Sequence, residues 1–317
     1  MEAAKMATEG FISHLSIHQK NCKNTKDLSR VLLESLAVAH NSVISSKADP
    51  LDVGTTTLIG GTIFPVAGDD KDEFGVCIIS IGDCKCFLWE AETETVRDIT
   101  SGNRGNIIDA RDCGGRLGPY SDGGMPDTRN LELFYSTCHT GDLLVFCSDG
   151  VHDNLDSASL GVDPGDLSED LKGMATWKEA SEKNKEVAEK VRKMFYEVRL
   201  GMLINEQIKG NNDNEDNDNH GRESIGNEED EKRSKKDAKK TKRKKKGKDG
   251  KRETPKPVDV VDTLADYCLR TTYTSRWFME NNPTKRQPTD YKLYPGKMDH
   301  TTSVVIKVGD PTQSMKQ

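Results

Sequence analysis

Residues 146–153 read Phe-Cys-Ser-Asp-Gly-Val-His-Asp, and they continue the most apolar run of the chain, Leu143–Cys147. The length of that run and its β-branched and aromatic content indicate a strand covered on both faces. A carboxylate directly after such a strand, here Asp149, is held rigidly at the mouth of the sheet. Gly150 lets a backbone or a ligand approach closely. Asp153 follows four residues after Asp149, near enough to share a ligand if the chain turns helical there.

A second aspartate, Asp299, lies just before another strand-like run, Ser303–Val308. Asp149 and Asp299 are 150 residues apart in the sequence (299 − 149), but each lies at the end of a predicted strand. If the two strands are neighbours, the carboxylates converge, and carboxylate oxygens select Mg²⁺ or Mn²⁺ over zinc. Since an aspartate at a strand end is more often a turn former or a helix N-cap, spacing alone does not decide between these roles.

The remaining pattern predicts helices and short strands in an irregular order. Apolar residues at helical spacing predict a helix over 26–46. The pair Gly82-Asp83 predicts a tight turn that joins two strands, and the glycine-rich passage from Gly102 to Gly124 is typical of a loop. The other predicted elements are strands at 55–59, 76–81 and 84–89 and helices at about 177–204 and 259–280. Because the strands are too clustered for a regular parallel array, the pattern favours an α+β fold with helices packed on antiparallel sheet.

Charge is distributed unevenly along the chain. The formal net charge is −7, but residues 232–252 hold 14 Lys/Arg and 2 Asp/Glu, a local charge of 14 − 2 = +12. The rest of the chain therefore carries −7 − 12 = −19. An acidic body suits hard cations and repels nucleic acid.

Residues 209–256 are first rich in Asn, Asp and Glu and then rich in Lys. This composition predicts a disordered, acidic-then-basic insertion within a single domain that spans 1–317. The basic part, 232–252, is compatible with a solvated insertion without a specific partner or with a nuclear-import signal. Nucleic-acid binding is the least favoured interpretation, because no aromatic residues interleave the charges.

Eight cysteines are scattered without the paired spacing of zinc ligands, which predicts reduced and mostly buried thiols. No stretch approaches the length of about 20 apolar residues that a membrane span needs. These patterns predict a cytoplasmic or nuclear protein that does not associate with a membrane and is a monomer.

Four motifs together resemble the metal-dependent protein Ser/Thr phosphatases of type 2C (the PPM family). Ser-Asp-Gly-Val-His-Asp at 148–153 resembles the S-D-G-h-x-D motif of that family, and 298–306 resembles its D-N-h-T end. Ile81-Gly-Asp-Cys-Lys85 resembles its G-D-S-R hairpin, and Gly54-Thr-Thr-Thr57 its upstream G-T/S-T-A strand. The motifs come in the family's order and cover about residues 28–308.

The resemblance implies a sandwich of two antiparallel β-sheets flanked by helices, with metals at one end. It implies that Asp149 and Asp299 bind the first catalytic Mg²⁺ or Mn²⁺, and that Asp83 and Asp153, with Asp149, can hold a further metal. The implied reaction is hydrolysis of phosphoserine or phosphothreonine in phosphoprotein substrates by a metal-activated water. No catalytic residue beyond the metal ligands is implied.

The sequence also departs from the family. The D-G-H-G motif, which supplies the metal-bridging aspartate, is expected just before the helix at 26–46 but does not occur in residues 1–27. His300 replaces the usual Asn, and Cys84 the usual Ser. We therefore expect an N-terminally truncated domain with little activity of its own. The alternative hypothesis is a non-catalytic pseudophosphatase that binds a phosphorylated partner or acts as a scaffold.

Overall fold

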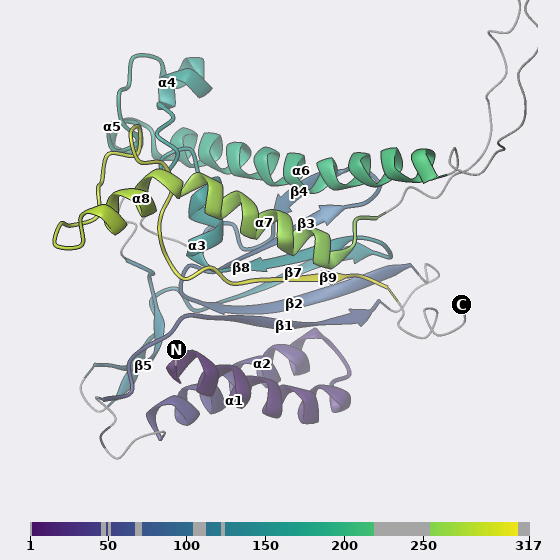
Figure 1. Cartoon of the computed structure of the whole chain (residues 1–317). Helices are drawn as coiled ribbons and strands as arrows, with labels where there is room; N and C mark the ends of the chain where they lie inside the picture. The colour runs from purple at the N-terminus through teal and green to yellow at the C-terminus, as the bar shows by residue number, and fades with distance from the viewer. Residues whose placement is uncertain are drawn as a thin grey trace, which may run out of the picture.

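The computed structural model describes residues 2–45, 49, 52–66, 72–103, 112–121, 124–218 and 254–309, without the side chains of residues 121 and 209–218. Its elements form four layers: a pair of helices, a three-stranded sheet, a four-stranded sheet and a second group of helices (Figure 1). The predicted α+β fold, with two antiparallel sheets in a sandwich flanked by helices, is confirmed.

The first helical layer consists of α1 (Glu2–His18) and α2 (Thr25–Ile44), joined by a short 3₁₀ turn at Gln19–Asn21. Helix α2 confirms the helix predicted over 26–46, and the side chain of Asn24 caps it by accepting from the backbone N–H of Asp27 at 2.9 Å. Helix α1 was not predicted from the sequence.

Three strands form the sheet beneath these helices, in the order β1 (Leu58–Pro65), β2 (Glu73–Ile81) and β7 (Glu132–His139). The second sheet has the order β4 (Thr95–Asp98), β3 (Lys85–Glu90), β8 (Leu143–Cys147) and β9 (Ser303–Lys307). All neighbouring strands within the two sheets are antiparallel. The passage 102–124, predicted as loop, contains β5 (Arg116–Ser121), which pairs with β6 (Met125–Asp127).

The tight turn predicted at Gly82-Asp83 is present, but the hairpin that the family resemblance implied there is not formed. Strands β2 and β3 belong to different sheets, so here the chain crosses from one layer of the sandwich to the other. Gly82 has φ 101°, and an added Cβ would collide with Thr57, so only glycine fits this crossing. A local turn signal does not reveal whether the strands on either side pair with each other.

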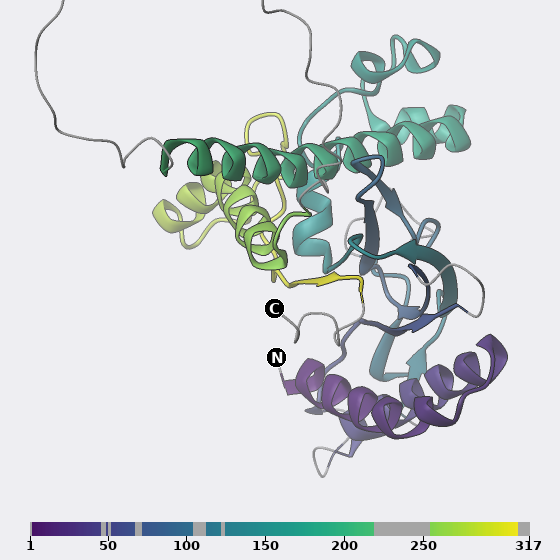
Figure 2. The same ribbon diagram turned by 90° about the vertical axis from the view of Figure 1, so that its right-hand side faces the viewer.

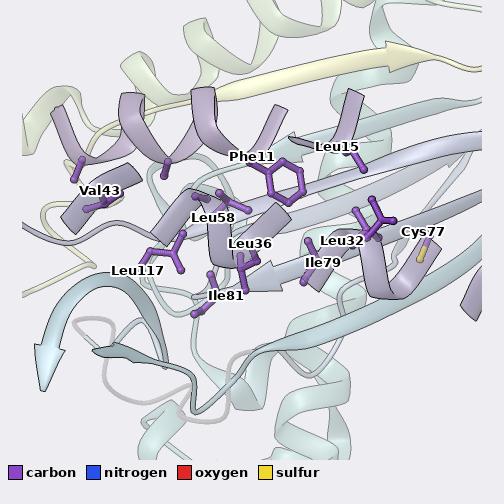
Figure 3. Close-up of a cluster of buried hydrophobic side chains, with 14 of the residues drawn as sticks. Phe11, Leu15, Leu32, Leu36, Val43, Leu58, Cys77, Ile79, Ile81 and Leu117 are labelled. Atoms are coloured by element: carbon purple, nitrogen blue, oxygen red, sulfur yellow. The ribbon is translucent and has the colours of Figure 1, made fainter. Parts of the chain in front are cut away.

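Burial on both faces explains the continuous apolar runs. In β2, Cys77, Ile79 and Ile81 pack against α1 and α2, as Figure 3 shows. The alternate residues of β2 face the second sheet, where Val76 and Ile78 pack with Leu144 of β8. The strand predicted at Leu143–Cys147 is covered on both faces, as expected: the residues that alternate with Leu144 pack against the second helical layer.

The second helical layer lies on the opposite side of the sandwich from α1 and α2 (Figure 2). It contains the short helices α3 (Asp149–His152), α4 (Pro164–Leu167) and α5 (Trp177–Lys183), the long helix α6 (Lys185–Asp218), and α7 (Pro257–Thr271) and α8 (Tyr273–Asn281). The helix predicted at 177–204 is thus two helices, and so is the one predicted at 259–280. Helix α6 runs ten residues into the segment 209–256 (218 − 208). Residues 219–253, with the basic tract, lie outside the described residues.

The eight cysteines are free thiols, and six of them are buried. Burial raises the pKa of Cys84 to about 12, so this thiol is protonated and inert near neutral pH. Within the described ranges, no helix is long and apolar enough to cross a membrane.

A buried ion pair joins β3 to β4 within the second sheet, and a hydrogen bond from Tyr196 of α6 joins the pair to the helical layer. The ammonium of Lys85 lies 2.7 Å from the carboxylate of Asp98, which also accepts hydrogen bonds from Tyr196 and Thr100. Burial opposes ionisation of Asp98, but the charge of Lys85 and the hydrogen bonds from Lys85, Tyr196 and Thr100 together outweigh it and lower the pKa of that carboxyl. The carboxylate is therefore charged and fully partnered inside the protein.

We expect Lys85→Met to lower the free energy of unfolding by about 3–5 kcal/mol, because it leaves the buried charge of Asp98 without its cation. Lys172→Met is the matched control, since the ion pair of Lys172 with Glu169 is exposed and its loss costs at most about 1 kcal/mol. Urea unfolding of the variants measures both values. Equal effects of the two substitutions would contradict the importance of the buried pair.

Candidate functional site

The site is built where β8 ends and β9 begins. The two strands pair in antiparallel register, with Cys147 opposite Ser303, so Asp149 after β8 and Asp299 before β9 lie at the same end of the sheet. The neighbouring strands that the sequence analysis required for convergence are therefore present. Helix α3 starts at Asp149 and brings Asp153 to the same side one turn later.

Backbone and hydroxyl contacts fasten the two chain segments to each other. The hydroxyl of Ser148 donates to the carbonyl of His300 at 2.9 Å and accepts from the N–H of Thr302 at 3.0 Å. A Cβ added at Gly150 would collide with the carbonyl oxygen of His300. The close approach that Gly150 permits is thus to the neighbouring backbone, and it lets the two aspartates face one another.

Three of the four predicted metal-site aspartates surround one ammonium group. The Nζ of Lys297 lies 2.5 Å from Asp149 Oδ2, 3.2 Å from Asp153 Oδ2 and 3.4 Å from Asp299 Oδ2. Its side chain is 14% exposed, and that of Asp153 is 4% exposed. Burial alone lowers the pKa of Lys297, but Asp153 and Asp149 outweigh it and raise that pKa above the ordinary value, so the amine is charged.

Asp83, the fourth predicted residue, is buried and joins the cluster indirectly. Its backbone carbonyl lies 2.8 Å from Nε2 of His152, and Nδ1 of the same ring lies 3.2 Å from Asp153 Oδ1. His152 is itself buried and therefore holds Asp153 in place.

Lys297 and His152 are the residues that sequence reasoning missed. Lys297 could have been found from the sequence, because a lysine two positions before Asp299 lies at the same strand end as that aspartate. Nothing in the sequence marked His152, whose role depends on the turn at Asp83 from a distant part of the chain.

The carboxylates fit one hard cation. They come from rigid strand and helix ends, and the ammonium shows that all three reach a single positively charged group. As arranged, with Lys297 in that position, no group of three or more His, Cys, Asp or Glu side chains in the described part of the chain forms a metal site. The oxygen chemistry of these carboxylates suits a divalent metal, but the positions that they occupy around the ammonium do not form a site for one.

A cavity of about 620 Å³ adjoins the cluster, between α7 and the loop before β9. Lys297, Asp299 and His300 line it on one side, and Cys268, Leu269 and Arg276 on the other. Arg276 is tied to the end of α7 by a hydrogen bond of 2.6 Å to the carbonyl of Leu269. The cavity gives the charged cluster direct access to a partly apolar binding surface.

We expect Gly150→Ala to lower the free energy of unfolding by about 1–3 kcal/mol, because the added methyl forces the His300 segment away from α3. Gly201→Ala in α6 is the control: its methyl meets only Val96 at 3.7 Å, and alanine in a helix is favoured over glycine by about 0.5–1 kcal/mol. Urea unfolding should therefore show a lower free energy of unfolding for Gly150→Ala and a higher one for Gly201→Ala than for the unsubstituted chain. A stabilising Gly150→Ala would show that the two segments do not pack as described.

Comparison with known proteins places this geometry in a wider context. No family model matches the chain. Among solved structures, the phosphatase domain of SpoIIE from Bacillus subtilis overlaps 96% of this chain and 74% of its own at 12% identity and a TM-score of 0.32. A phosphatase from Toxoplasma gondii overlaps 59% and 77% at 13% identity and a TM-score of 0.32. These overlaps are too loose to carry an argument about function.

A curated relative gives the sequence comparison. The PP2C-like domain-containing protein CG9801 of Drosophila melanogaster is 28% identical over 164 residues, which are 49% of this chain and 22% of that protein. The match therefore spans about a fifth of the relative's length. With this similarity, the resemblance of the chain to the type 2C phosphatase family is confirmed.

Proposed function

We propose that this chain is a protein Ser/Thr phosphatase domain that hydrolyses phosphoserine and phosphothreonine in protein substrates with Mg²⁺ or Mn²⁺. The observation that carries the proposal is the convergence of Asp149, Asp153 and Asp299 on one cation at the joined ends of β8 and β9. The similarity to a PP2C-like domain-containing protein supports the same reaction class.

The charge of the cluster supports a need for a divalent cation. Three carboxylates and the ammonium of Lys297 carry a net charge of 1 − 3 = −2. A phosphate monoester, itself doubly negative near neutral pH, is repelled by such a cluster. In the proposed reaction Asp149 and Asp299 hold the metal, and Asp153 adds a third oxygen, oriented by His152. A metal bound there supplies an activated water and positive charge for the phosphoryl oxygens.

The adjoining cavity supports a peptide substrate over a small phosphate ester. Its lining from α7, including Cys268 and Leu269, offers apolar contact to the residues that flank a phosphorylated side chain. Arg276 adds a positive charge at the far side of the cavity. Binding of flanking residues there would offset part of the repulsion at the cluster.

A second candidate function is a non-catalytic module that binds phosphorylated partners or acts as a scaffold. The contacts of Lys297 do not favour it, because three carboxylates around one ammonium leave a net negative charge that repels phosphate. We also propose a cytoplasmic or nuclear location. This part of the proposal, like any use of the basic tract, rests on the composition of the sequence alone.

Turnover of a phosphothreonine peptide at saturating Mn²⁺ tests the first function. We expect Asp149→Asn to lower kcat/KM by at least about 100-fold, because it removes one of the charged carboxylates proposed to bind the metal. Asp166→Asn changes an exposed carboxylate of α4 and should leave kcat/KM within about twofold. Phosphate release is measured with the full chain.

Two results would overturn the assignment. Equal turnover by Asp149→Asn and the unsubstituted chain would remove the site from the reaction. Saturable peptide binding without phosphate release at any Mn²⁺ concentration would replace the phosphatase by the binding module.

A further inference from the structure

The surroundings of Lys297 differ from those of the other buried lysine in the sandwich. Lys85 contacts one carboxylate, Asp98, whose remaining lone pairs are used by hydroxyl donors. Lys297 contacts three carboxylates within 3.4 Å, so a single ammonium charge is shared among three carboxylates. The first arrangement is balanced as it stands, whereas the second favours any cation of higher charge.

The backbone delivers Lys297 to this position in a fixed way. Its N–H donates to Oδ1 of Asn154 at 2.8 Å, and its carbonyl accepts from Nδ2 of the same side chain at 3.1 Å. The amide of Asn154 also donates to the carbonyl of Gly150 at 2.7 Å, which links Lys297 directly to α3. Gly296, with φ 84°, leaves no room for a Cβ against Asn154. The lysine is therefore anchored at its backbone to the helix that carries Asp149 and Asp153.

A divalent ion bound by the same oxygens would lie close to the position of the ammonium. Two positive charges a few ångströms apart in a partly buried site repel strongly, and each carboxylate oxygen that contacts Nζ is one that a metal needs. Lys297 also lines the cavity of about 620 Å³ beside α7. That cavity gives its flexible side chain space to leave the cluster while its backbone stays anchored.

From this arrangement we propose that Lys297 is a tethered cation that holds the metal position closed. Lys297 and one divalent metal ion exclude each other at Asp149, Asp153 and Asp299. The proposal rests on the proposed function for the identity of the ion and deepens it by naming the chain's own residue that controls metal entry. The metal-free domain is then a stable resting state, and the metal-bound domain has Lys297 in the cavity.

Mn²⁺ titration by isothermal calorimetry tests this exclusion without reference to turnover. We expect Lys297→Met to bind Mn²⁺ more tightly than the unsubstituted chain by about tenfold or more, within the usual range of coupling between two sites. Lys297→Gln, which is also neutral but polar, should give the same gain. Lys297→Arg keeps the charge and should stay within about twofold of the unsubstituted chain.

Thermal unfolding separates the exclusion from a merely structural role of the lysine. In EDTA, Lys297→Met should unfold at a lower temperature, because three carboxylates are left without their cation. Saturating Mn²⁺ should restore its Tm. Lys85→Met is the matched control: it also loses a buried cation, but a single carboxylate does not hold Mn²⁺, so Mn²⁺ should raise its Tm no more than it raises that of the unsubstituted chain.

The outcomes distinguish this inference from the proposed function. Tighter Mn²⁺ binding by Lys297→Met and Lys297→Gln without phosphate release would support the exclusion and count against hydrolysis. Phosphate release with equal Mn²⁺ affinity in all variants would support hydrolysis and overturn the exclusion. Absence of Mn²⁺ binding in every variant, or weaker binding by the neutral variants, would also overturn it.

Discussion

The antiparallel pairing of β8 with β9 is the interaction on which the candidate site depends. It joins two segments that are 150 residues apart in the sequence (299 − 149) and places the end of one beside the start of the other. Because β8 is buried on both faces, its end cannot shift without disturbing two cores at once. The aspartates that follow and precede these strands inherit that rigidity.

The helical layers on both sides of the two strands stabilise this end of the sandwich. Helices α1 and α2 cover one sheet with an apolar core, while α6 and α7 cover the other. Within the second sheet, the Lys85–Asp98 pair has its hydrogen bonds satisfied, in part by Tyr196 of α6, which makes it a structural interaction. The cluster at Lys297 also pairs an ammonium with carboxylates, but it has more carboxylates than ammonium groups. Such an excess of negative charge is typical of a ligand-binding site.

Both candidate functions depend on this excess of negative charge around Lys297. As described, the carboxylates contact the ammonium of Lys297, and their excess of negative charge repels phosphate. The same oxygens, without the lysine, form the donor set that Mg²⁺ and Mn²⁺ prefer. The proposed phosphatase activity and the proposed role of Lys297 are therefore linked, because both concern which cation these oxygens bind.

Much of the fold could be predicted from local patterns of apolar and polar residues in the sequence. Helical periodicity predicted α2, because one face of that helix is buried and the other is exposed. The uninterrupted apolar run at Leu143–Cys147 predicted a central strand, because burial on both faces leaves no polar position. The motif Ser-Asp-Gly at 148–150 and the aspartate at 299 predicted the candidate cation site, because a carboxylate at a strand end is held in one place.

What the sequence did not contain were contacts between distant segments. The turn at Gly82 looks the same locally whether the strands beside it pair or separate into two sheets, and only packing against Thr57 and the second sheet decided this. Likewise, Lys297 is one of many lysines until the pairing of β8 with β9 brings three carboxylates to it. The sequence by itself determined the strands, the helical faces and the aspartates, since these depend on neighbours along the chain. Only the tertiary structure decided which cation those aspartates hold, because that depends on charges that folding brings within 4 Å of one another.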